Sequence, residues 1–214
     1  MKNLSRKYNR SSSIIISHIQ NNFREYLIAS IIFVIGILLG IVFVNNLNTA
    51  QSNEITEYLT ATVTNLKENE HQNILILLKS SIQNNILLVI VLWLMGSTVI
   101  GLLLVFFIVC FKGFCLGYTI SSIIFVLGTG KGIILFIITM FLKNIIVIPG
   151  IICLTVSGMN VYKSIMKNRR KDNIKLEIIR HTLFATFILI LLILSSFLEV
   201  YLSQAILKYC IKYF

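Results

Sequence analysis

Ionisable side chains inside long apolar stretches are the residues of this sequence that could do chemistry. Lys143, followed by Asn144, lies in an apolar stretch that starts near Gly132, and Glu199 lies in another that ends near Leu207. At a helical rise of about 1.5 Å per residue, Lys143 would be about 16 Å and Glu199 about 12 Å from those ends. Because a charge in lipid needs a partner, we predict that Lys143 and Glu199 pair, as a structural clamp or as part of a polar cavity. The alternative is that each reaches the interface or pairs elsewhere.

Lys112 is a third ionisable residue in an apolar context, within the stretch FKGFCLGY from Phe111 to Tyr118. We predict that it marks a tight cytoplasmic turn between two spans, with Gly113 relieving the backbone. The alternative is a lysine at a helix end that reaches the interface and has no other role.

The other polar residues do not form the motifs of known catalytic chemistry. The histidines are scattered, and neither H-E-x-x-H nor a pair of histidines at helical spacing occurs. The stretch GTGKG, from Gly128 to Gly132, lacks the pattern of a phosphate-binding loop and indicates a short outer turn. The four cysteines favour no metal or redox role, because a cysteine in an apolar span usually behaves as a small hydrophobic residue. We therefore predict a protein that is not an enzyme, with no catalytic residue, no metal and no cofactor.

The elements that position these residues follow from the composition. Hydrophobic residues make up 57% of the 214 residues and charged residues only 13%, and the mean hydropathy is +0.88. Such a chain is a polytopic membrane protein rather than a water-soluble globule. Its net charge of +11 lies in the segments between the apolar stretches. This placement favours the head groups of anionic lipids as the charged partner, and not nucleic acid.

An all-α bundle of about five transmembrane helices is the predicted fold, because a bilayer core needs roughly 20 apolar residues per helix. The expected spans are Tyr26 to Val44, Asn85 to Cys110, Gly113 to Leu127, Gly132 to Met159 and His181 to Leu207. Residues 1–25 then form a basic arm, 26–44 the first span, 45–84 an extracytoplasmic loop, and 85–214 a four-span bundle with a basic loop at about 160–180. Since short loops rich in lysine and arginine stay in the cytoplasm, we predict a cytoplasmic N-terminus and an outer C-terminus.

The loop from Asn45 to Asn84 is too small for an ordinary catalytic domain. Part of it has apolar residues at the spacing that gathers one stripe on a helix. This stripe comprises Ile55, Tyr58, Leu59, Thr62, Val63 and Leu66. The stripe could pack on its own bundle or lie in the membrane interface, or it could be a docking face for an extracytoplasmic partner.

Small residues predict where helices approach closely. Gly36 and Gly40, and likewise Gly113 and Gly117, form G-x-x-x-G patterns in apolar segments. Such patterns let two membrane helices pack backbone to backbone, and we predict packing within one chain; the alternative is a homo-oligomer. Pro149 should kink the fourth span, because proline removes a backbone donor.

Three stretches of the sequence carry a resemblance to a known family. They are Leu92 to Ile123, with a tryptophan and a glycine early in a span and F-K-G after it; Lys143 to Pro149; and Phe197 to Ser203, with an acid followed by an aromatic residue. In these stretches, and in the order of its arm, loop and spans, the chain resembles stage II sporulation protein M of endospore-forming bacteria.

The resemblance implies a multi-pass protein of the mother-cell membrane, at the septum and engulfing membrane, that takes part in engulfment of the forespore. It implies a non-enzymatic scaffold that holds stage II sporulation proteins D and P, which cleave peptidoglycan. A small transporter or channel subunit that uses Lys143, Asn144 and Glu199 is the alternative hypothesis. A membrane-embedded hydrolase is a third, without a nucleophile or metal motif to support it.

Overall fold

The computed structural model describes residues 20–68, 74–137, 140, 142–167 and 171–210. Within these residues the chain forms seven helices and contains no strand. The two shorter helices are α3 (Thr49–Glu68) and α6 (Thr129–Phe136). The five longer ones are α2 (Phe23–Asn45), α4 (Ile74–Gly96), α5 (Gly101–Leu127), α7 (Leu142–Lys167) and α8 (Lys171–Cys210).

Each of the five longer helices is long and apolar enough to cross a membrane. A helix satisfies its backbone hydrogen bonds internally, so it is the element that such apolar segments can form in lipid. The predicted fold class, a polytopic all-α bundle with about five spans, is therefore confirmed.

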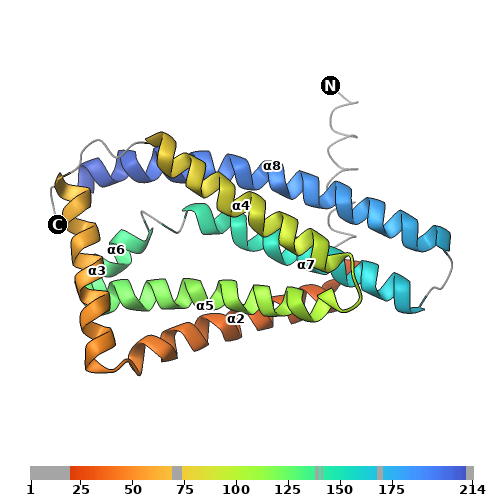
Figure 1. Cartoon of the computed structure of the whole chain (residues 1–214), viewed down its shortest axis with the longest axis horizontal. Helices are drawn as coiled ribbons and strands as arrows, with labels where there is room; N and C mark the ends of the chain where they lie inside the picture. Colours follow the sequence, from red (N-terminus) through yellow and green to blue (C-terminus); the bar gives the residue numbers. More distant parts are fainter. Residues whose placement is uncertain (1–19, 69–73, 138–139, 141, 168–170, 211–214) are drawn as a thin grey trace.

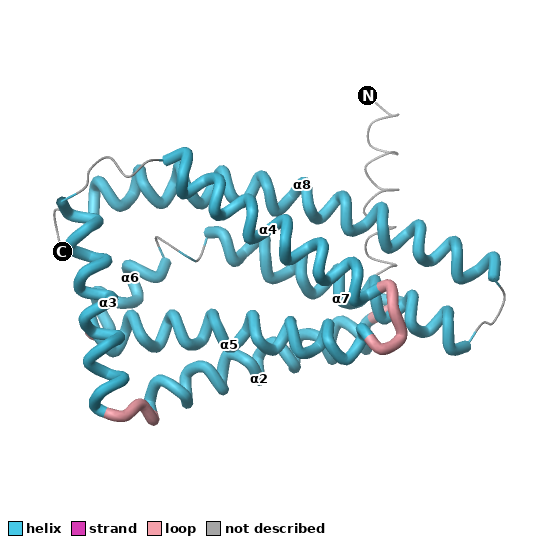
Figure 2. The backbone as a smooth tube through the Cα atoms, viewed as in Figure 1, coloured by secondary structure: helices cyan, strands magenta, loops and turns pink. Residues whose placement is uncertain are grey.

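The long helices form two groups, which Figures 1 and 2 show one above the other. Helices α2 and α5 pack against each other, and α4, α7 and α8 make up the second group. A buried apolar core joins the groups, with Phe33, Val105, Leu154 and Leu192 among its members. Helix α3 lies across one end of the bundle (Figure 1), which we call the α3 end. The start of α2 and the turn between α4 and α5 lie at the opposite end.

The predicted G-x-x-x-G residues lie where α2 and α5 touch. A Cβ atom on Gly36 would overlap the carbonyl oxygen of Cys110, and one on Gly40 would overlap that of Phe114. From the other side, a Cβ on Gly117 would overlap the carbonyl oxygen of Ile37. Gly113 is similarly close to the backbone of Phe33. The two patterns thus pack α2 and α5 backbone to backbone within one chain.

The predicted turn at Lys112 is wrong, because Lys112 lies inside the uninterrupted helix α5. The chain instead turns at Ser97–Ile100, where the Thr98 hydroxyl accepts a hydrogen bond from the Gly101 N–H at 3.1 Å. The glycine after Lys112 serves packing against α2 rather than a turn. The expected short third span from Gly113 is therefore part of a span of 27 residues.

The expected boundaries of the loop and of the four-span bundle also change. Helix α4 begins at Ile74, so the segment from Ile74 to Asn84 belongs to a candidate span and not to the 45–84 loop. Within this segment the buried Ser81 hydroxyl bonds to Glu199, so its partner lies inside the bundle. The basic region at about 160–180 is likewise largely helical, at the end of α7 and the start of α8.

The expected fourth span from Gly132 is divided. Gly128 has a φ of 78°, which a residue with a side chain rarely adopts, and it separates α5 from α6. Helix α6 then ends at Phe136, and α7 begins at Leu142. Pro149 lies within α7, which continues through it to Lys167. Lys143 is in the first turn of α7.

Candidate functional site

The structure brings Lys143 and Glu199 together. The Lys143 ammonium lies 3.0 Å from each oxygen of the Glu199 carboxylate. Helix α7 supplies the lysine and α8 the glutamate. About a fifth of each side chain is exposed. The ion pair thus joins two membrane helices at a place that is only partly covered by protein.

Polar groups of α4 extend this pair into a network. The Ser81 hydroxyl donates a hydrogen bond to Glu199 Oε2 at 2.5 Å. One helical turn further on, the Asn85 amide donates to Ser196 Oγ at 2.8 Å and to the Leu192 carbonyl at 3.2 Å. Ser81, Asn85 and Ser196 are buried. The network therefore ties α4 to α7 and α8 by charge-assisted and neutral hydrogen bonds.

Sequence reasoning missed Ser81, Asn85 and Ser196. The signal was present, because Ser81 and Asn85 are four residues apart and so share one face of a helix. The predicted loop from Asn45 to Asn84 nevertheless includes Ser81 and ends just before Asn85. Polar residues at helical spacing next to an apolar stretch are compatible with the buried face of a helix as well as with the end of a loop.

The network has the chemistry of a clamp rather than of a catalyst. Both oxygens of Glu199 already accept hydrogen bonds, and Lys143 is bound to the same carboxylate. A nucleophilic serine would need a free base beside it, and the serines here lie beside an amide, a paired carboxylate and backbone carbonyls. In the described part of the chain, no group of three histidine, cysteine or acidic residues could hold a metal ion.

A second ion pair joins α7 to α2 at the opposite end of the bundle. Lys163 pairs with Glu25, whose side chain is only 12% exposed. Close to it, the Tyr26 hydroxyl lies 3.6 Å from Cys153 Sγ, again between α2 and α7. Lys163 falls in the region at about 160–180 that we predict as a basic loop, and Glu25 falls in the predicted basic arm. The helix ends extend further than expected, which is why this contact could not be foreseen.

His181 is fully buried where α4, α7 and α8 meet. Its Nδ1 lies 2.9 Å from Ser157 Oγ and its Nε2 lies 3.4 Å from the Trp93 carbonyl oxygen. Gly96 of α4 and Gly158 of α7 lie against each other, and a Cβ atom on Gly96 would also meet the His181 ring. The absence of a side chain at both positions lets the two helices and the ring pack closely. A ring with a partner on both nitrogens acts as part of the core.

Lys112 differs from Lys143 and Lys163, which form ion pairs. It lies near the middle of α5, about 17 Å from the start of the helix at Gly101. Its side chain is half-buried, and among the described residues it forms neither a hydrogen bond nor an ion pair. Among the described residues, no acid of the bundle therefore neutralises Lys112.

The predicted docking face on α3 is divided by the structure. Ile55 and Leu59 are half-buried and, with Ser52 and Thr56, turn toward the bundle. Tyr58 is 73% exposed and Thr62 is exposed. The side chains of Val63 and Leu66 lie outside the described residues. One part of the stripe therefore packs on the chain's own bundle, and Tyr58 and Thr62 remain open to a partner.

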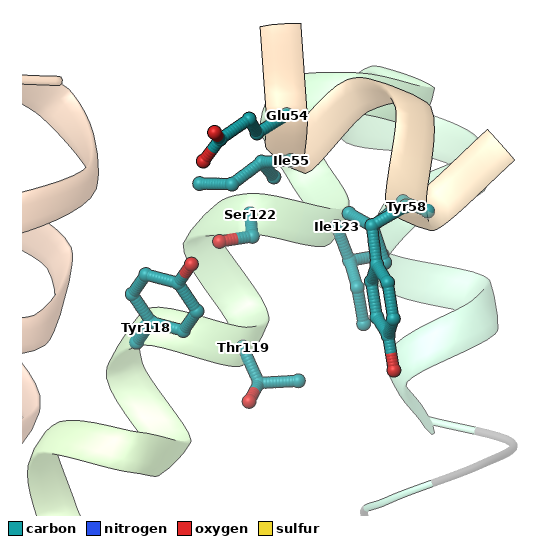
Figure 3. A pocket seen from close by; sticks show the side chains of 8 residues that line it. Glu54, Ile55, Tyr58, Tyr118, Thr119, Ser122 and Ile123 are labelled. Atoms are coloured by element: carbon teal, nitrogen blue, oxygen red, sulfur yellow. The ribbon is translucent and has the colours of Figure 1, made fainter. Parts of the chain in front are cut away.

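A pocket of about 490 Å³ lies between α3 and the adjacent half of α5. Helix α3 contributes Glu54, Ile55, Tyr58 and Leu59, and α5 contributes Tyr118, Thr119, Ser122 and Ile123. Figure 3 shows the hydroxyl groups of Tyr118 and Ser122 pointing toward one another beneath Glu54. The Ser122 hydroxyl is buried, and no described group forms a hydrogen bond with it.

Comparison with known proteins gives one match. The model of the family Stage II sporulation protein M matches residues 29–204, which is most of the chain. The chain belongs to this family. It is therefore a sporulation-related, multi-pass membrane protein, and its family is not a known enzyme family. Neither the curated proteins nor the solved structures contain a significant match.

Proposed function

We propose that this protein is a non-enzymatic membrane scaffold of the sporulation engulfment complex. It would anchor the peptidoglycan hydrolases stage II sporulation proteins D and P at the septal and engulfing membrane of the mother cell. Membership of the family supports a role in sporulation. The observation that carries the scaffold role is that Lys143, Glu199 and Ser81 join helices α4, α7 and α8 to one another, whereas Tyr58 and Thr62 of α3 stay exposed at one end.

An outward orientation of α3 follows from the same proposal. The hydrolases act on peptidoglycan outside the membrane, so their docking face must lie there as well. The basic residues near the start of α2 and around the α7–α8 connection would then lie in the cytoplasm, against anionic head groups. This arrangement places the N-terminus inside and the C-terminus outside.

Capture of the two hydrolases tests the scaffold role. We expect both to co-purify with the tagged full-length protein from sporulating membranes, and we expect them to lose their septal location when its gene is deleted. If neither hydrolase associates, or if septal location and septal thinning persist in the deletion strain, the scaffold role is wrong.

A transporter or channel subunit is the second candidate. It is favoured by the ion pair of Lys143 and Glu199, which is only partly covered by protein, since ionisable residues inside membrane spans are typical of ion and substrate pathways. Reconstitution in liposomes separates the two functions. A specific flux that is lost in Lys143→Met and Glu199→Gln would favour transport, whereas no flux above that of empty liposomes would favour the scaffold.

A further inference from the structure

Helix α5 carries a polar stripe on the side that faces away from α2. The stripe comprises Lys112, Cys115, Thr119 and Ser122, at spacings of three, four and three residues. Residues at these spacings share one side of a helix. The glycines that touch α2, Gly113 and Gly117, are on the other side. The stripe therefore runs along α5 from the middle of the membrane to the pocket beneath α3.

At each end of this stripe, a polar side chain has no hydrogen-bond or ion-pair partner among the described residues. Lys112 has no acidic partner among the described residues. Ser122 is 4% exposed, and its hydroxyl has no described hydrogen-bond partner. A charge or hydroxyl held away from water without a partner is costly. A ligand that supplies an anion at one end and a hydrogen-bonding group at the other would remove both costs.

The stripe is only partly covered by protein, because Lys112, Cys115 and Thr119 are half-buried. Beside it, four aromatic rings follow one another along α5: Phe107, Phe111, Phe114 and Tyr118, with centroid separations of 6.2 to 6.4 Å. Phe107 and Phe111 are 67% and 54% exposed. Phe114 and Tyr118 pack against Phe43 of α2, whereas Phe107 and Phe111 leave an exposed aromatic surface on which another helix can pack.

A second copy of this chain does not fit the stripe. In the described parts of the five spans, the carboxylates are those of Glu25, Glu177 and Glu199. Each already pairs with a cation of its own chain. A second copy would have to break one of these pairs to neutralise Lys112. The anion must therefore come from a different molecule.

We propose that the α5 stripe receives a transmembrane helix of a partner protein that carries an aspartate or glutamate at the depth of Lys112. About 15 Å further toward the α3 end, a polar side chain of the same helix would bond to the Ser122 hydroxyl. The charge complementarity selects the occupant: an unpaired carboxylate in a partner's span has the same need for a counter-ion as Lys112. This proposal rests on the scaffold role and states how one partner is held within the membrane.

The test compares Lys112→Leu with Lys79→Leu, which removes an exposed lysine of α4. Each full-length variant captures the two hydrolases from solubilised sporulating membranes. We expect Lys112→Leu to lower the capture of one hydrolase at least about tenfold, because truncating one member of a buried charge pair is strongly unfavourable. Lys79→Leu should capture as the wild type does. Lys112→Leu should also raise the melting temperature of the isolated protein, because it removes an uncompensated charge.

A charge exchange identifies the partner helix. Lys112→Glu should lose capture, and replacing the responsible acid of the partner's span by lysine should restore it. Unchanged capture by Lys112→Leu overturns the inference and leaves the scaffold role intact, whereas failure of the wild type to capture either hydrolase removes the scaffold role itself. A loss of capture together with a lowered melting temperature would make Lys112 a structural residue. If Lys112→Leu instead lowers capture of a differently tagged second copy, the occupant is that copy and the inference is also wrong.

Discussion

At the scale of single residues, two lysines within the spans differ in whether an acid neutralises them. Lys143 has both oxygens of Glu199 as partners, and Ser81 completes the coordination of that carboxylate. Lys112, one helix away, has no such partner among the described residues. The first arrangement stabilises the bundle, and the second leaves an unfavourable charge that a partner can relieve.

Replacing Glu199 by glutamine should destabilise the protein, because Lys143 keeps its charge and loses its counter-ion. Breaking a buried ion pair costs about 3–5 kcal/mol, and we expect about 2 kcal/mol here because a fifth of each side chain is exposed. Thermal unfolding of the purified protein in detergent measures the change. The exchange Lys143→Glu with Glu199→Lys should recover part of the loss. If the exchange is no more stable than either single variant, the pair is not a clamp.

At the scale of elements, the backbone contact between α2 and α5 fixes one group of helices. The four glycines of the two G-x-x-x-G patterns lie against carbonyl oxygens of the opposite helix. Dispersion and close approach, rather than exclusion of water, stabilise such contacts in lipid. A single methyl group is therefore enough to force the helices apart.

Gly117→Ala should lower the free energy of unfolding by about 3 kcal/mol, since overpacking costs about 1–3 kcal/mol and here the obstacle is the Ile37 backbone. Gly130→Ala in α6 is the matched control, because nothing lies within 4 Å of the added methyl group. It should leave stability unchanged or raise it, as alanine favours a helix over glycine. Equal effects of the two substitutions would show that the contact does not hold α2 to α5.

The sequence predicts much at the level of elements and less at their ends. Hydropathy gave the number of spans and the fold class, and the G-x-x-x-G patterns indicated the close contact of α2 and α5. The turn at Lys112 was wrong because a charge next to glycine resembles a loop, although the helix tolerates both. The predicted span starts at Asn85, eleven residues after the start of α4 at Ile74. Only the fold shows that the partners of Ser81 and Asn85 lie more than 100 residues away on α8. The pairing of Lys163 with Glu25 had no local signal.

At the scale of the whole molecule, the bundle has two distinct ends. The α3 end has a transverse helix and the pocket above α5, whereas the opposite end has the start of α2 and the second ion pair. A scaffold for extracytoplasmic hydrolases requires the α3 end to face outward. The distribution of the basic residues and the proposed function therefore predict the same orientation, which can be tested on its own.

Single cysteines in an otherwise cysteine-free protein should report this orientation. A membrane-impermeant thiol reagent should label Tyr58→Cys in intact cells and should label Lys175→Cys only after permeabilisation, since both positions are exposed but lie at opposite ends. Labelling of Lys175→Cys from outside would reverse the orientation and with it the docking face.

Crosslinking from α3 tests the scaffold role most directly. A photoreactive amino acid at Tyr58, which is 73% exposed, is compared in sporulating cells with one at Thr56, which turns toward the bundle. We predict crosslinks to stage II sporulation protein D or P from position 58 and far fewer from position 56. If neither exposed position of the predicted docking face on α3, Tyr58 nor Thr62, crosslinks to a hydrolase in cells that are completing engulfment, this face is not the docking site and the central claim is contradicted.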